Sequence, residues 1–245
     1  MAKRGKWLFL SFLLLGVGLF CCWKIDRQPP ESEMRIVAQT VETQDSITVE
    51  KVLQEEKEVG ETMKIAITFD DGPHPHYTEQ LLDGLKERNV RATFFVTGEH
   101  AELHPDIIER IADEGHLIGN HTYSHMQLSS KNREAYKEEL LKTNEIISSI
   151  TGTEVLFVRP PYGTWDKSLE TELNMFPVLW SVDPQDWCSS DAPGITRKII
   201  KKAGENDIIL MHDYYASSVT AALSAIDELL KEGYEFVTVD EILFD

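Results

Sequence analysis

Residue types used in acid–base and metal chemistry follow short apolar runs at five places in this sequence. In chain order they are Asp70 and Asp71 after KIAITF, His121 after HLIGN with His125 four positions on, Arg159 after VLFV, Asp183 after PVLWSV, and His212 after DIILM. Scattered surface residues would not gather at the ends of five separate runs. If the runs are parallel strands of an α/β barrel, their carboxyl ends meet on the face where such barrels place active sites.

The segment HTYSH (121–125) has a spacing suited to a metal ion. Two histidines four residues apart can reach one ion from a helical turn or a tight loop. One added carboxylate gives a His₂–Asp site with a position open for water, which is the pattern of a catalytic zinc site. The same ligand types accept other divalent ions such as Co²⁺. Alone, the histidine spacing more often marks surface residues, and the strand-end carboxylates favour the metal site.

Asp70 and Asp71 are adjacent carboxylates, which is a costly arrangement unless their roles differ. A division with Asp71 as metal ligand and Asp70 as general base resolves this cost. The alternative is a pair that caps the turn before Gly72 and Pro73. Arg159 can hold one carboxylate, since a buried arginine seldom lacks a partner, and its alternative role is a structural ion pair.

His212 is either a buried histidine with satisfied hydrogen bonds or a general acid. The nearby strand-end Asp183 favours the acid, because a carboxylate partner raises the pKa of histidine. The segment RPPYG (159–163) contains two consecutive prolines, which make a stiff turn. Such a turn can present a backbone N–H to an oxyanion.

Alternating strands and helices must position these residues. Strands are expected at 64–70, 92–97, 116–121, 155–159, 177–183, 207–213 and 235–239. Helices are expected at 78–89, 105–114, 131–150, 166–175, 196–203 and 219–231. Apolar strands separated by helices indicate a parallel sheet covered on both faces. We therefore expect an α/β fold, a distorted (β/α) barrel with about seven parallel strands, and an open doubly wound sheet is the alternative.

The first 62 residues differ from the rest in composition. Basic residues precede an uncharged run, so we expect 1–6 to be a cytoplasmic tip and 7–23 a transmembrane signal anchor. Residues 24–62 are acidic and read as an extracellular stalk, before a catalytic domain at 63–245. The predicted location is the cell membrane, with the domain outside. A cleaved signal peptide and a secreted protein are the alternative.

Charge and cysteine content exclude two classes of protein. The chain has 24 Lys+Arg against 42 Asp+Glu, a net charge of −18. This excess of acid argues against nucleic acid as a partner, because few basic groups are left to neutralise phosphates. Three cysteines exclude a disulfide scaffold. No protein partner is predicted from the sequence.

Five ordered segments of the sequence resemble the motifs of the polysaccharide deacetylases. They are TFDDGP (68–73), HTYSH (121–125), RPPYG (159–163), DPQDW (183–187) and LMHD (210–213). The family is also described as the NodB-homology proteins, or carbohydrate esterase family four, and the resemblance covers residues 64–243. It implies a distorted barrel and metal-dependent hydrolysis of N-acetyl groups on N-acetylglucosamine polymers.

Matched to these motifs, one group of residues is implied to act at the metal. Asp71, His121 and His125 would bind one divalent ion, usually Zn²⁺. Asp70 would be the general base, and Arg159 would orient it.

A second group is implied to act on the sugar and its leaving amine. His212 would be the general acid, steadied by Asp183. The backbone N–H of Tyr162 would join the oxyanion site, Tyr162 and Trp187 would wall the sugar groove, and Leu210 would line the acetyl pocket.

The expected function is removal of N-acetyl groups from a cell-wall polysaccharide containing N-acetylglucosamine. The external location favours peptidoglycan. Chitin oligomers or another extracellular polysaccharide are the alternative substrates. A non-catalytic carbohydrate-binding wall protein is a third interpretation, and it carries little weight because none of the motif positions is broken.

Overall fold

The computed structural model describes residues 62–244 of the 245-residue chain. The predicted cytoplasmic tip, the anchor at 7–23 and the stalk up to residue 61 lie outside the described residues. Within 62–244, no helix is both long enough and apolar enough to cross a membrane.

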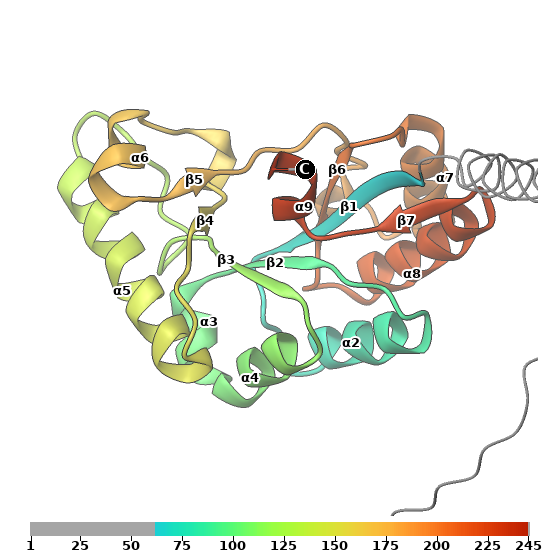
Figure 1. The fold of residues 1–245 in the computed structure, drawn as a ribbon, viewed down its shortest axis with the longest axis horizontal. Helices are drawn as coiled ribbons and strands as arrows, with labels where there is room; N and C mark the ends of the chain where they lie inside the picture. The colour runs from blue at the N-terminus through green and yellow to red at the C-terminus, as the bar shows by residue number, and fades with distance from the viewer. Residues whose placement is uncertain (1–61, 245) are drawn as a thin grey trace, which may run out of the picture. The chain divides into compact units, whose positions relative to one another are not determined.

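Parallel strands form the centre of the described part of the chain (Figure 1). Their bounds are β1 (Met63–Asp70), β2 (Thr93–Val96), β3 (Leu117–Asn120), β4 (Phe157–Val158), β5 (Phe176–Pro177), β6 (Ile208–His212) and β7 (Tyr234–Phe236). The order is β5-β4-β3-β2-β1-β6, and β7 pairs with the first residues of β1. A single parallel bridge from Val182 to Ile209 joins the segment after β5 back to β6. The predicted α/β fold with about seven parallel strands is confirmed, and in the described residues the strands form a half-barrel rather than a fully closed barrel.

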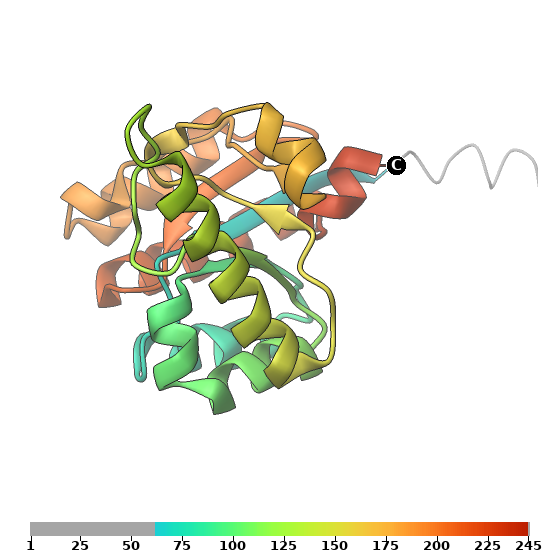
Figure 2. The ribbon, with the colours of Figure 1, turned by 90° about the vertical axis from the view of Figure 1, so that its left-hand side faces the viewer.

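Helices surround this sheet. They are α2 (Tyr77–Glu87), α3 (Gly98–Leu103), α4 (Pro105–Asp113), α5 (Arg133–Thr151), α6 (Ser168–Leu173), α7 (Ala192–Lys202), α8 (Ala216–Lys231) and α9 (Val239–Phe244). Among these described helices, α9 alone packs on the interior face of the sheet. α7, α8, α2, α4 and α5 contact one another in that order and form a continuous outer layer. Figure 2 shows α5, in yellow-green, running across the sheet on the side turned toward the viewer.

Strand β1 shows why the site residues point where they do. Successive side chains of a strand point to opposite faces. Ile67 and Phe69 therefore pack among helix side chains in the main core, while Ala66 lies on the other face with barrel-interior residues. The same alternation places Thr68 and Asp70 on the interior side, at the carboxyl end of the strand. The hydrophobic pattern of β1 thus directs Asp70 into the barrel.

The segment after β2 contains a helix that the sequence pattern did not predict. We expected one helix from Pro105, and the structure adds α3 immediately before it. The two helices meet at His104, which has φ −132° and ψ 59°. A residue before proline is disfavoured in helical conformation, so α3 must end there.

The strand expected at 177–183 is wrong in its extent, since β5 ends at Pro177. The carbonyls of Val178 and Leu179 accept hydrogen bonds from the buried Arg159 guanidinium instead of continuing the sheet. A charged side chain that is fully buried needs such acceptors, and here they come from the backbone that would otherwise extend the strand.

The last predicted strand, 235–239, is also too long. β7 ends at Phe236, and α9 begins at Val239. The backbone N–H of Thr238 donates to Glu241 Oε1 at 3.2 Å, which is the return contact of a capping box. The sequence TVDE carried this helix-start signal.

Candidate active site

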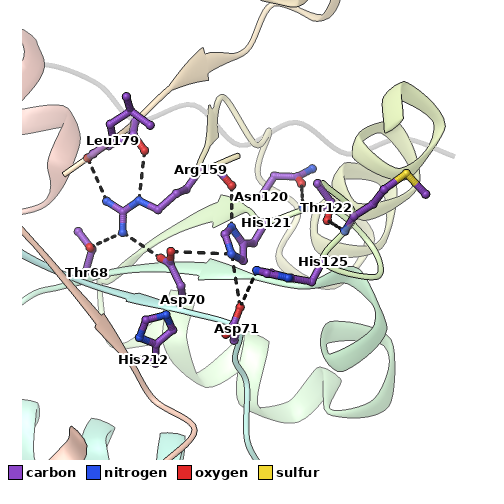
Figure 3. Close-up of polar contacts among 12 residues, drawn as sticks. Thr68, Asp70, Asp71, Asn120, His121, Thr122, His125, Arg159, Leu179 and His212 are labelled. Carbon is purple, nitrogen blue, oxygen red and sulfur yellow. Dashed lines mark hydrogen bonds and ion pairs between the residues drawn. The ribbon is translucent and has the colours of Figure 1, made fainter. Parts of the chain in front are cut away.

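The carboxyl ends of the strands surround one pocket of about 360 Å³. Its lining includes nine of the ten residues expected to form the site, together with Pro160 and Trp180. The nine are Asp70, Asp71, His121, His125, Tyr162, Asp183, Trp187, Leu210 and His212. The tenth, Arg159, lies buried beside the pocket and contacts Asp70 (Figure 3).

Three of these residues form a cluster with the spacing of metal ligands (Figure 3). Asp71 Oδ1 lies 3.4 Å from His121 Nε2 and 3.5 Å from His125 Nε2. The Nδ1 of His121 lies 2.6 Å from the carbonyl oxygen of Arg159. When Nδ1–H donates to that carbonyl, the lone pair of Nε2 faces the cluster, which is how protein structures orient histidine ligands. Asp70 Oδ2 lies 3.8 Å from His121 Nε2.

The donor set of this cluster fits a divalent cation. Asp71 Oδ1 is buried and has no hydrogen-bond partner in the described part of the chain, whereas buried polar atoms are normally paired. Burial raises the pKa of Asp71, but the contact with His121 at 3.4 Å and the charges of His121, His212 and His125 lower it to about 2. One ionised carboxylate oxygen and two imidazole nitrogens match a zinc site with an open position, and they also suit other divalent metals.

Helix α5 holds the loop that carries the two histidines. Glu139 accepts hydrogen bonds from the backbone N–H groups of Tyr123 at 3.2 Å and Ser124 at 3.0 Å. Within the same loop, Thr122 and His125 have φ values of 63° and 57°. Such left-handed conformations are strained for residues with a side chain and persist where the surroundings impose them. The α5 contacts therefore support the orientation of His125.

Arg159 fixes one oxygen of Asp70. The guanidinium is fully buried, and its Nη1 donates to Asp70 Oδ1 at 2.9 Å and to Thr68 Oγ1. Nε donates to the carbonyl of Val178 at 3.1 Å, and Nη2 to that of Leu179 at 3.3 Å. Thr68 was not predicted, although its place two residues before Asp70 puts it on the same face of β1. Asp70 thus keeps one oxygen paired and the other directed toward the metal-ligand cluster.

The expected pairing of Asp183 with His212 is wrong. His212 Nδ1 lies 2.9 Å from Asp186 Oδ1, and the backbone N–H of His212 donates to Asp186 Oδ2 at 2.9 Å. Asp183 lines the pocket, but its Oδ1 accepts from the backbone N–H of Gln185 at 2.7 Å. Gln185 has φ 61°, and this left-handed turn brings the second carboxylate of DPQD back against β6. The only sequence signal for Asp186 was its presence in the same motif.

Asp186 changes the protonation of His212. Burial alone lowers the pKa of His212, but the hydrogen bond and charge of Asp186, with the charges of Asp70 and Asp71, raise it to about 9. The imidazole is therefore protonated at neutral pH. With Nδ1 bound to Asp186, a protonated Nε2 is available to donate a proton to a molecule in the pocket.

Aromatic and apolar side chains form the walls of the pocket. Tyr162 and Trp187 are both largely exposed, while Leu210 is buried. Tyr162 has φ 59° and its ring meets the ring of His125 edge-on at 5.0 Å. Trp180 is a further wall residue, which was not predicted from the sequence. Such walls suit a ring-shaped ligand with apolar faces.

Together these groups provide a carboxylate, a protonated imidazole and a cluster of cation ligands around one cavity. A carboxylate beside a cation site can take a proton from water, and an imidazolium can give one to a leaving group. This arrangement supports metal-assisted hydrolysis of an acyl bond.

Comparison with known proteins identifies the family. Residues 57–178 match the family model described as polysaccharide deacetylase. A peptidoglycan-N-acetylglucosamine deacetylase of Bacillus cereus is 41% identical over 183 residues, covering 72% of this chain and 66% of that protein. A chitooligosaccharide deacetylase of Rhizobium leguminosarum bv. trifolii is 43% identical over 153 residues, covering 61% of this chain and 71% of that protein.

A solved structure supports the same assignment. The peptidoglycan deacetylase PdaC of Bacillus subtilis superposes with a TM-score of 0.70 at 38% identity, covering 74% of this chain and 90% of the solved one. By sequence, PdaC is named a peptidoglycan-N-acetylmuramic acid deacetylase, and the match spans only 38% of its full length. The chain belongs to the polysaccharide deacetylase family.

Proposed function

We propose that this protein removes N-acetyl groups from N-acetylglucosamine residues of peptidoglycan with the help of one divalent metal ion. Zn²⁺ is the first candidate for this ion, and Co²⁺ is the second. The observation that carries the proposal is the placement of Asp70, the Asp71–His121–His125 cluster and His212 around one pocket. The name of the 41% identical Bacillus cereus relative supports the substrate.

Asp71, His121 and His125 would hold the metal ion in this proposal. When bound, the ion supplies Lewis acidity that polarises the acetamide carbonyl and acidifies water. Asp70 accepts the proton of the attacking water with the oxygen that Arg159 leaves unpaired. Arg159 keeps the carboxylate oriented for that step, since its guanidinium is itself held by backbone carbonyls.

His212 completes the reaction by protonating the departing amine, because Asp186 keeps its imidazole charged at neutral pH. The backbone N–H of Tyr162 donates to the developing oxyanion, an interaction of the type whose loss costs roughly 2.7–4 kcal/mol. Tyr162 and Trp187 hold the sugar ring, and Leu210 contacts the acetyl methyl group. Acetate and a glucosamine residue are the products.

For location, we propose that residues 7–23 anchor the chain in the cell membrane with the catalytic domain outside, next to the wall. The apolar run and its preceding basic residues support this placement. Separation of membrane and secreted fractions tests it, and recovery of the full activity in the secreted fraction contradicts it.

The experiment for the activity is acetate release by the full chain with added zinc, on peptidoglycan and on N-acetylglucosamine oligomers in parallel. Release from peptidoglycan supports the proposal, with Asp70→Asn as the inactive control. Release from the oligomers alone supports the second candidate, chitin oligomer deacetylation, which the 43% identical chitooligosaccharide deacetylase favours. Release from neither substrate by metal-loaded protein contradicts both and favours a binding protein.

A further inference from the structure

A second pocket of about 240 Å³ adjoins the metal-ligand cluster and has no part in the proposed reaction. It is lined by Asp71, Thr97, His100, His125, Tyr214 and Tyr215. Asp71 and His125 also line the first pocket, so the two cavities meet at the metal ligands. A ligand in the second cavity would therefore lie beside the cluster that faces the first cavity.

The polar groups of the second pocket are built into the fold. Thr97 is 4% exposed, and its hydroxyl oxygen is buried with no hydrogen-bond partner within residues 62–244. His100 Nδ1 lies 2.7 Å from the carbonyl oxygen of Asp71, and donation to that carbonyl leaves Nε2 as the acceptor nitrogen of the ring. An unpaired buried hydroxyl is unusual in a folded protein and indicates a missing partner. A ligand bearing hydroxyl or amide groups would supply it.

The open side of this pocket is aromatic. Tyr214 and Tyr215 are 38% and 47% exposed. The Tyr214 ring stacks on His100 at 5.7 Å with an interplanar angle of 27°, and it meets His74 edge-on at 4.9 Å. The tyrosine is therefore held in place while part of its surface stays accessible. Tyrosine offers an apolar face with a polar edge, which suits a sugar ring whose C–H face is apolar and whose rim carries hydroxyl groups.

The charge of the pocket favours a neutral ligand. None of its six lining residues is a lysine or an arginine. A carboxylate or phosphate on the ligand would therefore lack a basic partner and would lie near the Asp71 carboxylate, which disfavours anionic groups. A neutral N-acetylated sugar meets the polar groups without this repulsion.

We propose that Thr97, His100, Tyr214 and Tyr215 bind the neutral N-acetylhexosamine residue next to the one being deacetylated. The proposal deepens the proposed function and depends on it, because it names the neighbouring residue of the same polysaccharide chain. It makes the enzyme selective for chains of at least two sugars. It also gives Tyr214, which follows the site sequence LMHD directly, a role in substrate choice.

The test compares kinetics on the N-acetylglucosamine tetramer for the full zinc-loaded chain and its variants. Tyr214→Ala is expected to raise KM about tenfold, with little change in kcat. A tenfold change corresponds to the binding free energy of one aromatic contact. Tyr214→Phe, which keeps the ring, restores a KM near that of the wild type. Phe244→Ala removes an exposed aromatic residue that lines neither pocket and serves as the control. An unchanged KM in Tyr214→Ala, or an equal rise in Phe244→Ala, overturns the proposal.

A binding measurement separates this proposal from the proposed function. Calorimetric titration of the tetramer into Asp70→Asn and into Asp70→Asn/Tyr214→Ala needs no turnover. A tenfold weaker Kd in the double variant supports the second sugar site even if the wild type releases no acetate, in which case only the proposed function fails. Equal affinities for the two proteins overturn the second site even if the wild type is active. Thr97→Val, which replaces the hydroxyl by a methyl group of similar size, is expected to weaken binding in the same direction.

Discussion

Asp186 binds His212 through both of its carboxylate oxygens. Oδ1 lies 2.9 Å from the imidazole Nδ1, and Oδ2 accepts the backbone N–H of the same residue at 2.9 Å. One acidic side chain thus fixes both the position of the histidine in β6 and the direction of its ring. This double contact leaves Nε2 as the ring nitrogen available to the pocket.

The first prediction concerns the pH dependence of activity. The pKa of His212 is raised from 6.5 to about 9, so its acid form is present below that pH and is lost as the pH rises through it. Asp186→Asn removes the main favourable charge while burial still lowers the pKa. The alkaline fall in kcat is therefore expected to move toward neutral pH. A pH–rate profile of wild type and variant, in the same metal state, measures the shift.

Asp183→Asn is the control for this profile, because Asp183 does not contact His212. The alkaline limb of the pH–rate profile of this variant should lie at the same pH as that of the wild type. Equal shifts in both variants would contradict the assignment to Asp186.

The pair of Asp186 and His212 also affects the stability of the folded state. Since the pKa of His212 is raised in the folded state, the stabilisation that this pair contributes is complete below about pH 6.5. It is lost as the pH rises to about 9.

The second prediction concerns the buried pair of Asp70 and Arg159. Arg159→Met leaves a buried carboxylate without its cation and should lower the free energy of unfolding by about 3–5 kcal/mol. Asp70→Asn/Arg159→Met removes both charges and should recover part of this loss. Denaturant unfolding of the two single variants and the double variant measures the coupling. Strict additivity of the single effects would show that the pair has no energetic coupling.

The third prediction concerns metal binding. Zinc at a hundred times its Kd should raise the free energy of unfolding by about 2.7 kcal/mol, because it binds only the folded cluster. Thermal unfolding with and without zinc detects this as a higher Tm. The rise should be lost in His125→Ala and retained in His76→Ala, which changes an exposed histidine outside the cluster. A zinc-dependent rise of equal size in His125→Ala would contradict the assigned ligands.

The fourth prediction concerns the turn that follows Asp71. A Cβ added at Gly72 would overlap the buried carboxylate of Asp213, which accepts a hydrogen bond from Thr78 Oγ1. Gly72→Ala should therefore cost about 1–3 kcal/mol of stability. It should also weaken zinc binding, because the turn positions Asp71. Calorimetric zinc titration and denaturant unfolding of Gly72→Ala measure both effects, and a variant with wild-type values for both would contradict this steric role.

Much of the fold and site was predictable because the signals are local. The apolar run of β1 and the position of Asp70 at its end follow from alternation within eight residues. The histidine spacing at 121–125 and the motif order required no knowledge of long-range contacts. The length of β5 was not predictable in this way, because it is limited by Arg159, which lies in the chain before it and takes the carbonyls of Val178 and Leu179.

The sequence by itself determined the parallel α/β arrangement, the strand ends and the set of residue types that meet there, since hydrophobic period and residue order encode these properties. Only the tertiary structure decided that Asp186, and not Asp183, holds His212, because the choice depends on the left-handed turn at Gln185. It also decided that Thr97 and Tyr214, 117 positions apart in the chain, line one pocket. Contacts between loops depend on how each loop leaves its strand, and no local pattern in the sequence records that path.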